Sequence, residues 1–189
     1  MLRKLLAPLL IVLVLGGAAG VAFAAHSHGD NGDQLKDAEK ATKQFRSLPV
    51  ADRAGYKLLL DKDGIACIDM PGMGAMGVHY ANSALVGDGA IDPSTPEAMV
   101  YEPDGRGRMH LVAVEYVVLQ AAWDGQHHDK PSLFGETFAL TGADNRYGLL
   151  AFYSLHAWIY KDNPSGMFSM YNPNVTCTPD DNRGGQVDG

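Results

Sequence analysis

The pattern of apolar and polar residues changes from helical to extended near residue 56. Apolar residues recur every three or four positions in "LKDAEKATKQFRSL" (35–48), as on one face of an amphipathic helix. Asp33 can cap this helix, and Pro49 can occupy the first turn of a second short helix that ends at Gly55. The sequence therefore predicts two helices at the start of the folded region.

Short apolar runs separated by turn residues follow, a pattern typical of β-strands. The runs cover 56–60, 65–68, 76–86, 98–102, 109–120, 132–140 and 149–160. The turn sequence "DGRG" (104–107) predicts a hairpin between two of these strands. We predict an α+β fold in which N-terminal helices precede a mainly antiparallel, curved or barrel-like β-sheet.

The two ends of the chain differ in composition from its middle. Residues 1–24 combine a basic start, an apolar run and small residues in an Ala-x-Ala arrangement, the features of a secretory signal peptide. We expect a flexible linker at 25–33, a single domain at 34–177 and a disordered tail at 178–189. This organisation predicts a secreted or cell-envelope protein with no stable membrane anchor after cleavage. The alternative is that the apolar run is retained as an anchor.

Charge and cysteine content narrow the classes of partner. Lys and Arg number 15 against 22 Asp and Glu, a formal net charge of −7, which disfavours binding to the phosphates of nucleic acids. The only two cysteines, Cys67 and Cys177, favour one disulfide in an oxidising compartment. A thiolate metal ligand or nucleophile is the alternative.

Three ionisable residues lie in apolar strand patterns. In the run 109–120, alternation places Glu115 on one face with Leu111 and Ala113 and places Val112 on the other. His156 lies within "LLAFYSLHAWIY", and His79 leads into "VHYANSAL". A buried carboxylate is costly unless it is paired, hydrogen-bonded or bound to a cation.

Two imidazoles and one carboxylate suit an open, three-ligand zinc, iron or manganese site. The sequence thus predicts a metal site at His79, Glu115 and His156. Two alternatives stay open, namely structural hydrogen bonding and an acid–base pair without metal.

A second candidate metal site lies in "MPGMGAMGVH" (70–79). Its thioethers, from Met70, Met73 and Met76, are ligands that suit copper(I). However, the proline and glycines would break a helix that aligned them, so we favour a tight bend that delivers His79 to the sheet. The letters "GMGAMG" also match a phosphate-binding pattern, but no strand–helix unit surrounds them.

Five stretches resemble a group of secreted, functionally uncharacterised proteins found mainly in actinobacteria. They are "ATKQFRSLPVADRAGY" (41–56), "CIDMPGMGAMGVHYAN" (67–82), "PEAMVYEP" (96–103), "LVAVEYVV" (111–118) and "LHAWIYKDNPSGMFSMYNPNVTC" (155–177). The resemblance implies export, a single domain, and a C-terminal end that returns to Cys67. It implies no particular activity.

These observations favour an exported protein that binds a small molecule or a metal in an aromatic-lined pocket. The predicted walls are Tyr80, Tyr116, Phe152 and Trp158. One alternative is a metal-dependent enzyme that uses the same His/Glu/His group. Another is a non-catalytic envelope or interaction module in which these residues are structural.

Overall fold

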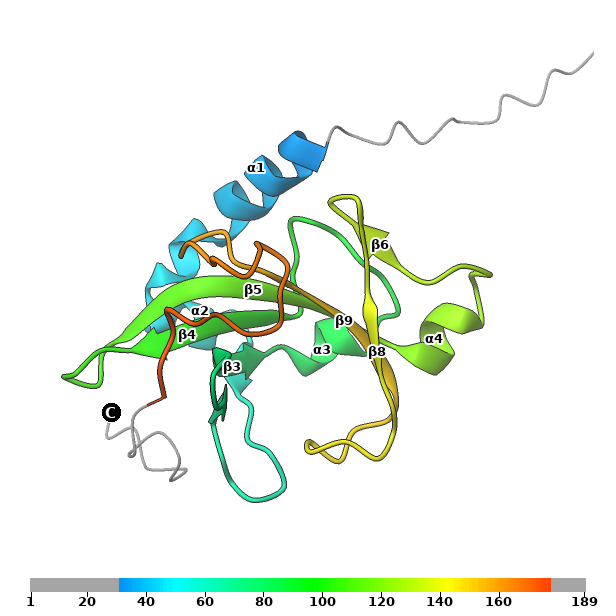
Figure 1. Ribbon diagram of the computed structural model, residues 1–189. Helices are drawn as coiled ribbons and strands as arrows, with labels where there is room; N and C mark the ends of the chain where they lie inside the picture. Colours follow the sequence, from blue (N-terminus) through cyan, green and yellow to red (C-terminus); the bar gives the residue numbers. More distant parts are fainter. Residues whose placement is uncertain (1–30, 178–189) are drawn as a thin grey trace, which may run out of the picture.

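The computed structural model describes residues 31–177 of the chain (Figure 1). The predicted signal peptide, residues 25–30 of the predicted linker, and the predicted tail lie outside this range. Among residues 31–177, no helix is long and apolar enough to span a lipid bilayer.

Helices form the first part of the described chain. They are α1 (Asn31–Thr42), the 3-10 helix η1 (Lys43–Arg46) and α2 (Leu48–Arg53). Helix α1 starts inside the predicted linker, so Asp33 is not its cap but lies in its first turn, where it pairs with Lys36 at 2.9 Å. A carboxylate is favourable there because the N-terminal end of a helix carries partial positive charge. Helix α2 has Pro49 in its first turn, as predicted.

Seven strands form one antiparallel sheet. They are β1 (Lys57–Leu58), β2 (Cys67–Met70), β3 (Gly74–Ala81), β4 (Ala98–Pro103), β5 (Met109–Leu119), β8 (Ala139–Thr141) and β9 (Phe152–Ala157). Their order is β1-β3-β4-β5-β9-β8, and β2 pairs with the first half of β3. The fold is α+β as predicted, but the sheet formed by these strands is open, so the barrel form of the prediction is wrong.

Three predicted strands end differently in the structure. Residues 83–86 form the short helix α3 (Ser83–Val86), because Asn82 caps it by accepting a hydrogen bond from the Ala84 N–H at 3.1 Å. Strand β5 runs directly into the helix α4 (Gln120–Asp124). The predicted strand 132–140 is divided among β6 (Ser132–Leu133), β7 (Glu136–Thr137) and β8. The break between β6 and β7 is a turn at Phe134, whose φ of 58° is incompatible with an extended strand. Strand β8 belongs to the larger sheet, where it pairs with β9.

Both faces of the sheet are covered. Helices α1 and α2 lie on one face (Figure 1), and the main core between them and the sheet includes Tyr80, Met99, Tyr101, Val114 and Tyr116. A smaller core on the other face consists of Ala75, Val100, Val112, Ala113, Trp158 and Val175.

A bulge in β5 overturns part of the predicted alternation. The register passes from the pair Val100–Ala113 to the pair Tyr101–Leu111, which leaves Val112 without a partner. Leu111 therefore lies in the main core and Val112 in the smaller core, opposite to the predicted faces. Residues after 113 keep their predicted faces.

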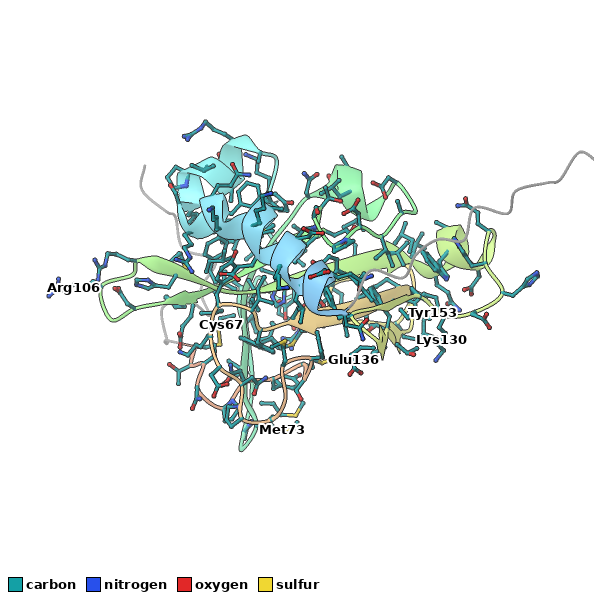
Figure 2. All side chains as sticks on the ribbon, turned by 90° about the horizontal axis from the view of Figure 1, so that it is seen from above. Cys67, Met73, Arg106, Lys130, Glu136 and Tyr153 are labelled. Atoms are coloured by element: carbon teal, nitrogen blue, oxygen red, sulfur yellow. A yellow bond between two sulfur atoms is a disulfide. The ribbon has the colours of Figure 1, made fainter. Side chains whose placement is uncertain are left out.

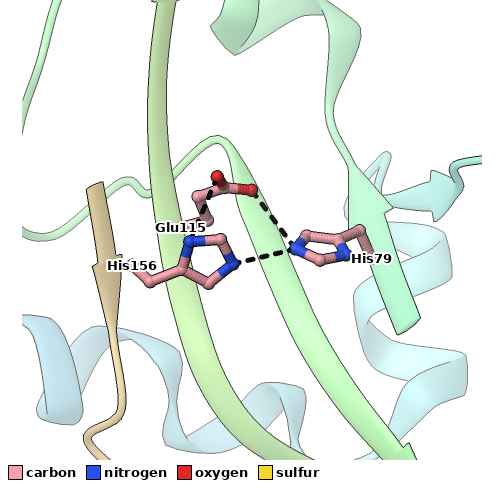
Figure 3. A group of neighbouring side chains, drawn as sticks. All are labelled: His79, Glu115 and His156. Carbon is pink, nitrogen blue, oxygen red and sulfur yellow. Dashed lines mark hydrogen bonds and ion pairs between the residues drawn. The ribbon is translucent and has the colours of Figure 1, made fainter. Parts of the chain in front are cut away.

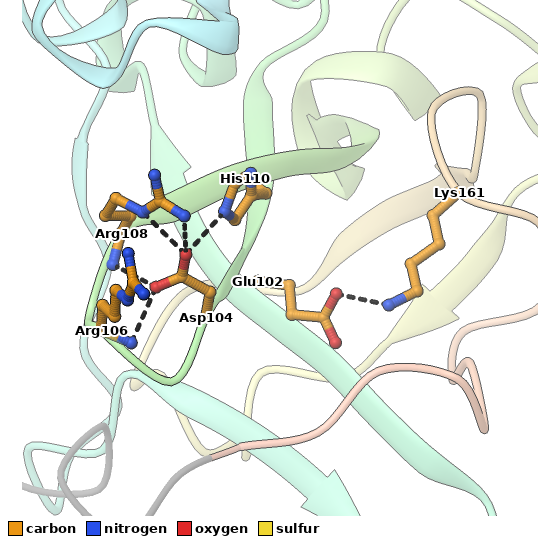
Figure 4. Close-up of polar contacts among 6 residues, drawn as sticks. All are labelled: Glu102, Asp104, Arg106, Arg108, His110 and Lys161. Carbon is orange, nitrogen blue, oxygen red and sulfur yellow. Dashed lines mark hydrogen bonds and ion pairs between the residues drawn. The ribbon is translucent and has the colours of Figure 1, made fainter.

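The predicted hairpin between β4 and β5 is confirmed, and Asp104 holds its turn together (Figure 4). Its carboxylate accepts hydrogen bonds from the backbone N–H groups of Arg106 and Arg108 at 2.8 and 3.0 Å. It also contacts His110 Nε2 at 3.1 Å. The hydrogen bond with His110 and those from the backbone lower the pKa of Asp104. The hairpin tip, marked by Arg106 in Figure 2, projects away from the rest of the sheet.

The C-terminal end of the described chain is tied to the β2–β3 hairpin. Cys67 and Cys177, 110 positions apart, form a disulfide. Ala75 and Asn172 exchange two backbone hydrogen bonds, at 3.2 and 3.0 Å. The two segments approach so closely that a Cβ on Gly74 would lie 2.1 Å from the Asn172 carbonyl oxygen. The glycine-rich stretch is therefore a tightly packed β-hairpin and not a phosphate-binding loop.

Candidate metal centre

Three ionisable side chains from three strands meet on the face of the smaller core (Figure 3). His79 Nε2 lies 3.1 Å from His156 Nε2 and 3.3 Å from Glu115 Oε2. His156 Nδ1 lies 3.4 Å from Glu115 Oε1. All three residues are buried, and one ligand atom from each falls within 4.8 Å of the others. We call these residues the His/Glu/His group.

The sheet register explains how the group assembles. Glu115 in β5 and His156 in β9 are direct cross-strand partners. His79 lies on β3, and β4 separates it from β5. At this level β4 presents Ala98, the partner of Glu115, whose single methyl group leaves room for the longer side chains to meet above it.

Gly77 positions His79 in two ways. Its φ of +90° and its packing require glycine, because a Cβ would lie 2.8 Å from the Tyr101 carbonyl oxygen in β4. Its backbone also forms a hydrogen bond with His79. Since His79 Nε2 faces the other two members of the group, this bond uses Nδ1–H and leaves a lone pair on Nε2.

Burial favours the uncharged form of each member. It lowers the pKa of His79 and of His156 to about 4. It also raises the pKa of Glu115, against the opposing effects of His79 and of a hydrogen bond with Ser154. Both imidazoles are therefore neutral near pH 7, and neutral imidazole is the form that binds metals.

The atoms that face one another are electron-pair donors. Two imidazole nitrogens 3.1 Å apart need a proton or a cation between them, because their lone pairs repel. One proton on His156 Nε2 and one on Glu115 would satisfy these contacts without a metal, and a divalent cation would satisfy them by displacing both protons. The ligand atoms of a tetrahedral zinc site lie about 3.3 Å apart, since each is about 2 Å from the ion. The distances of 3.1 and 3.3 Å from His79 Nε2 match this spacing, and the ligand atoms of His156 and Glu115 lie within 4.8 Å of each other.

A cavity of about 310 Å³ lies beside the group, and Glu115 and Ser154 form part of its wall. Tyr147 lines it from the loop between β8 and β9. Burial and the nearby Glu115 raise the pKa of Tyr147, so its hydroxyl stays protonated at neutral pH. The cavity is thus the side from which a small ligand would reach Glu115.

The loop that carries Tyr147 is anchored to the segment between β1 and β2. Arg146 Nη2 lies 2.7 Å from Asp61 Oδ2, and the Arg146 carbonyl accepts a hydrogen bond from the Lys62 N–H at 2.9 Å. Sequence reasoning missed Arg146 and Tyr147 as cavity residues, because nothing in the polar turn sequence indicates that it packs beside Glu115.

The structure does not bring the four predicted aromatic walls together. Phe152 lines the cavity, and Trp158 is buried with its ring stacked 6.1 Å from that of His156. Tyr80 and Tyr116 instead lie in the main core on the opposite face. They follow His79 and Glu115 directly, and consecutive strand residues point to opposite faces.

The three methionines of the copper alternative differ in environment. Met70 and Met73 are 41% and 51% exposed on the β2–β3 hairpin, and Figure 2 shows Met73 at its end, away from the sheet. Met76 is buried and lines the cavity beside Glu115, together with Met170 from the C-terminal segment. Sequence reasoning missed Met170. The copper site stays a prediction.

Comparisons with known proteins assign no function to the chain. The resemblance to secreted actinobacterial proteins gains no support from them and stays a prediction. No protein-family model, curated protein or solved structure matches the chain.

Proposed function

We propose that the protein is an exported metal-binding protein in which His79, Glu115 and His156 hold a divalent cation of the zinc, iron or manganese type. The observation that carries the proposal is the convergence of three buried ligand atoms from separate strands. Two imidazoles and one carboxylate form the protein ligands of several zinc and non-haem iron sites. The hydrogen bond from His79 to Gly77 supports the proposal, because metal-binding histidines commonly donate their other N–H to a backbone carbonyl.

Export is supported by different observations. The disulfide between Cys67 and Cys177 is of a kind that persists in oxidising compartments. The composition of residues 1–24 is that of a secretory signal. An extracytoplasmic location is therefore part of the proposal.

A metal-dependent enzyme is the second candidate, and the cavity beside Glu115 favours it. Three protein ligands leave at least one coordination position for water or substrate. A cation held there would activate bound water or polarise a bound oxygen atom. Substrate would reach the cation from the cavity, because Glu115 and Ser154 line it.

The first experiment is elemental analysis of the mature protein, purified from an exporting host without a His tag or chelator, followed by zinc and copper titration. We expect near-stoichiometric metal in the wild type. Binding should weaken at least about tenfold in His79→Ala and in Glu115→Gln, the second of which conserves side-chain volume. The matched control is His128→Ala, because His128 is exposed in the loop after α4. Circular dichroism establishes that each variant is folded.

The outcomes separate the candidates. A metal-free wild type that fails to bind on titration contradicts the proposal and supports a structural role in a non-catalytic module. Full metal content in both variants also contradicts it. Loss of copper binding only when Met70, Met73 and Met76 are replaced by leucine assigns the copper alternative. In the cobalt-substituted protein, spectral change on adding a small anion would indicate an exchangeable position and support the enzyme candidate.

A further inference from the structure

A second cavity, of about 330 Å³, is lined by residues that neighbour the His/Glu/His group. Its lining is largely apolar and includes Leu58, Ala81, Val86, Ala98, Val117 and Leu119. Ala98 is the cross-strand partner of Glu115, and Val117 lies two residues after Glu115 on the same strand. Positions two apart share a face of a sheet, so the apolar cavity and the group lie side by side on one face.

The apolar cavity and the cavity beside Glu115 share two residues, Tyr147 and Phe152. A strand advances about 3.3 Å per residue, so Val117 lies about 7 Å along β5 from Glu115. The surface therefore changes from ionisable to apolar over the length of a few carbon–carbon bonds. Such a surface fits a ligand with a polar head and an apolar body.

We propose that the apolar cavity binds the hydrocarbon part of a small monocarboxylate whose carboxylate is directed to the metal at the His/Glu/His group. This inference rests on the proposed metal site. A divalent cation with Glu115 as its single anionic ligand retains one positive charge, which favours an anionic head. Release of water from the apolar lining favours the hydrocarbon body.

The reverse orientation, with the carboxylate at the rim of the apolar cavity, is less favourable. The cationic side chain that lines this cavity is Lys57, and its Nζ already pairs with Asp52 Oδ1 at 2.7 Å. The remaining polar lining includes Ser83, which carries no charge. The charge that attracts an anion is therefore at the metal.

The experiment is calorimetric titration of the zinc-loaded and metal-free protein with hexanoate, octanoate and decanoate. We expect the affinity of the zinc-loaded protein to rise about fourfold per added methylene, as for burial of hydrocarbon, until the cavity is filled. Val86→Trp and Leu149→Trp, two separate changes in the lining, should each weaken decanoate binding at least about tenfold without changing metal content. Leu150→Trp is the matched control, because Leu150 is 68% exposed and lies outside this lining.

Metal content, measured in the same samples, separates the two proposals. If zinc binds but the carboxylates do not, or if both tryptophan variants bind decanoate as the wild type does, this inference is wrong and the metal site stands. If decanoate binds equally well with and without zinc, the placement of the carboxylate at the metal is wrong. If zinc itself does not bind, the proposed function fails.

Discussion

The replacement of Glu97 by glutamine should change how stability depends on pH. Glu97 precedes β4, is 2% exposed, and accepts a hydrogen bond from the Val117 N–H at 2.8 Å. Burial raises its pKa from 4.5 to about 8, and the nearby carboxylates of Asp88 and Glu115 add to the effect. The hydrogen bond from Val117 opposes this rise but does not cancel it.

The sign and size of the effect follow from linkage. A carboxyl group whose pKa is higher in the folded state binds more protons there than in the unfolded state. The free energy of unfolding is therefore highest below pH 4.5 and falls as the pH rises to about 8. At pH 7 the unfolded chain has ionised this group while the folded chain has not, which corresponds to a loss of about 3 kcal/mol. Above pH 9 the loss approaches about 5 kcal/mol. Glutamine does not titrate and escapes this loss.

Urea denaturation of the wild type and Glu97→Gln at pH 4.5, 6, 7 and 8 measures the effect. We expect the free energy of unfolding of the variant, relative to the wild type, to rise by about 3 kcal/mol between pH 4.5 and pH 7. The comparison across pH removes any constant cost of accommodating the amide. Glu136→Gln, at an exposed site in β7, controls for the removal of one negative charge. Curves for Glu97→Gln and wild type that stay parallel over this range would refute the reasoning.

Three further predictions concern the glycine hairpin, the disulfide and the cavity loop. Gly77→Ala should lower the free energy of unfolding by about 1–3 kcal/mol, measured by denaturation, and should weaken zinc binding. Gly105→Ala is the control and should change neither property, because a Cβ there meets nothing within 4 Å. Equal effects of the two changes would contradict the role given to Gly77. Replacing Cys67 and Cys177 together by serine should lower the free energy of unfolding by about 4–5 kcal/mol in guanidinium titration, and a loss below about 1 kcal/mol would contradict the entropy argument. Asp61→Asn should weaken the pairing with Arg146 and speed amide hydrogen exchange in residues 142–151; unchanged exchange there would show that the loop is held by other contacts.

Most helices and strands, and the three members of the proposed metal site, could be predicted from local pattern, but the convergence of these three residues could not. Alternation in the strands placed Glu115 and His156 on buried faces, and their pairing followed once β5 and β9 were neighbours. The convergence of His79 with them depends on the order of β3, β4 and β5, which no local pattern encodes. The prediction of Tyr80 as a pocket wall overlooked the same alternation, because Tyr80 is adjacent in sequence to His79 and points to the other face.

Other features depend on contacts between distant segments. The bulge at Val112 inserts one residue into β5, and the strand pattern is apolar on both sides of it, so hydrophobicity alone could not locate it. The cavity depends on how the loop containing Tyr147 is anchored through Arg146 to Asp61, 85 positions earlier in the chain. Polar turn residues specify that a chain reverses, but not what it packs against.

The spread of the His/Glu/His group over three strands has a consequence for the order of events during maturation. His79 and His156 are 77 positions apart, and they meet only after β9 has joined β5. A chain in which β9 has not yet paired with β5 lacks the assembled group, so capture of the proposed cation follows formation of the sheet. The proposed metal site and the proposed export together imply, for a chain that crosses the membrane unfolded, that the ion is acquired outside the cytoplasm and that the metals available in that compartment determine which one is bound.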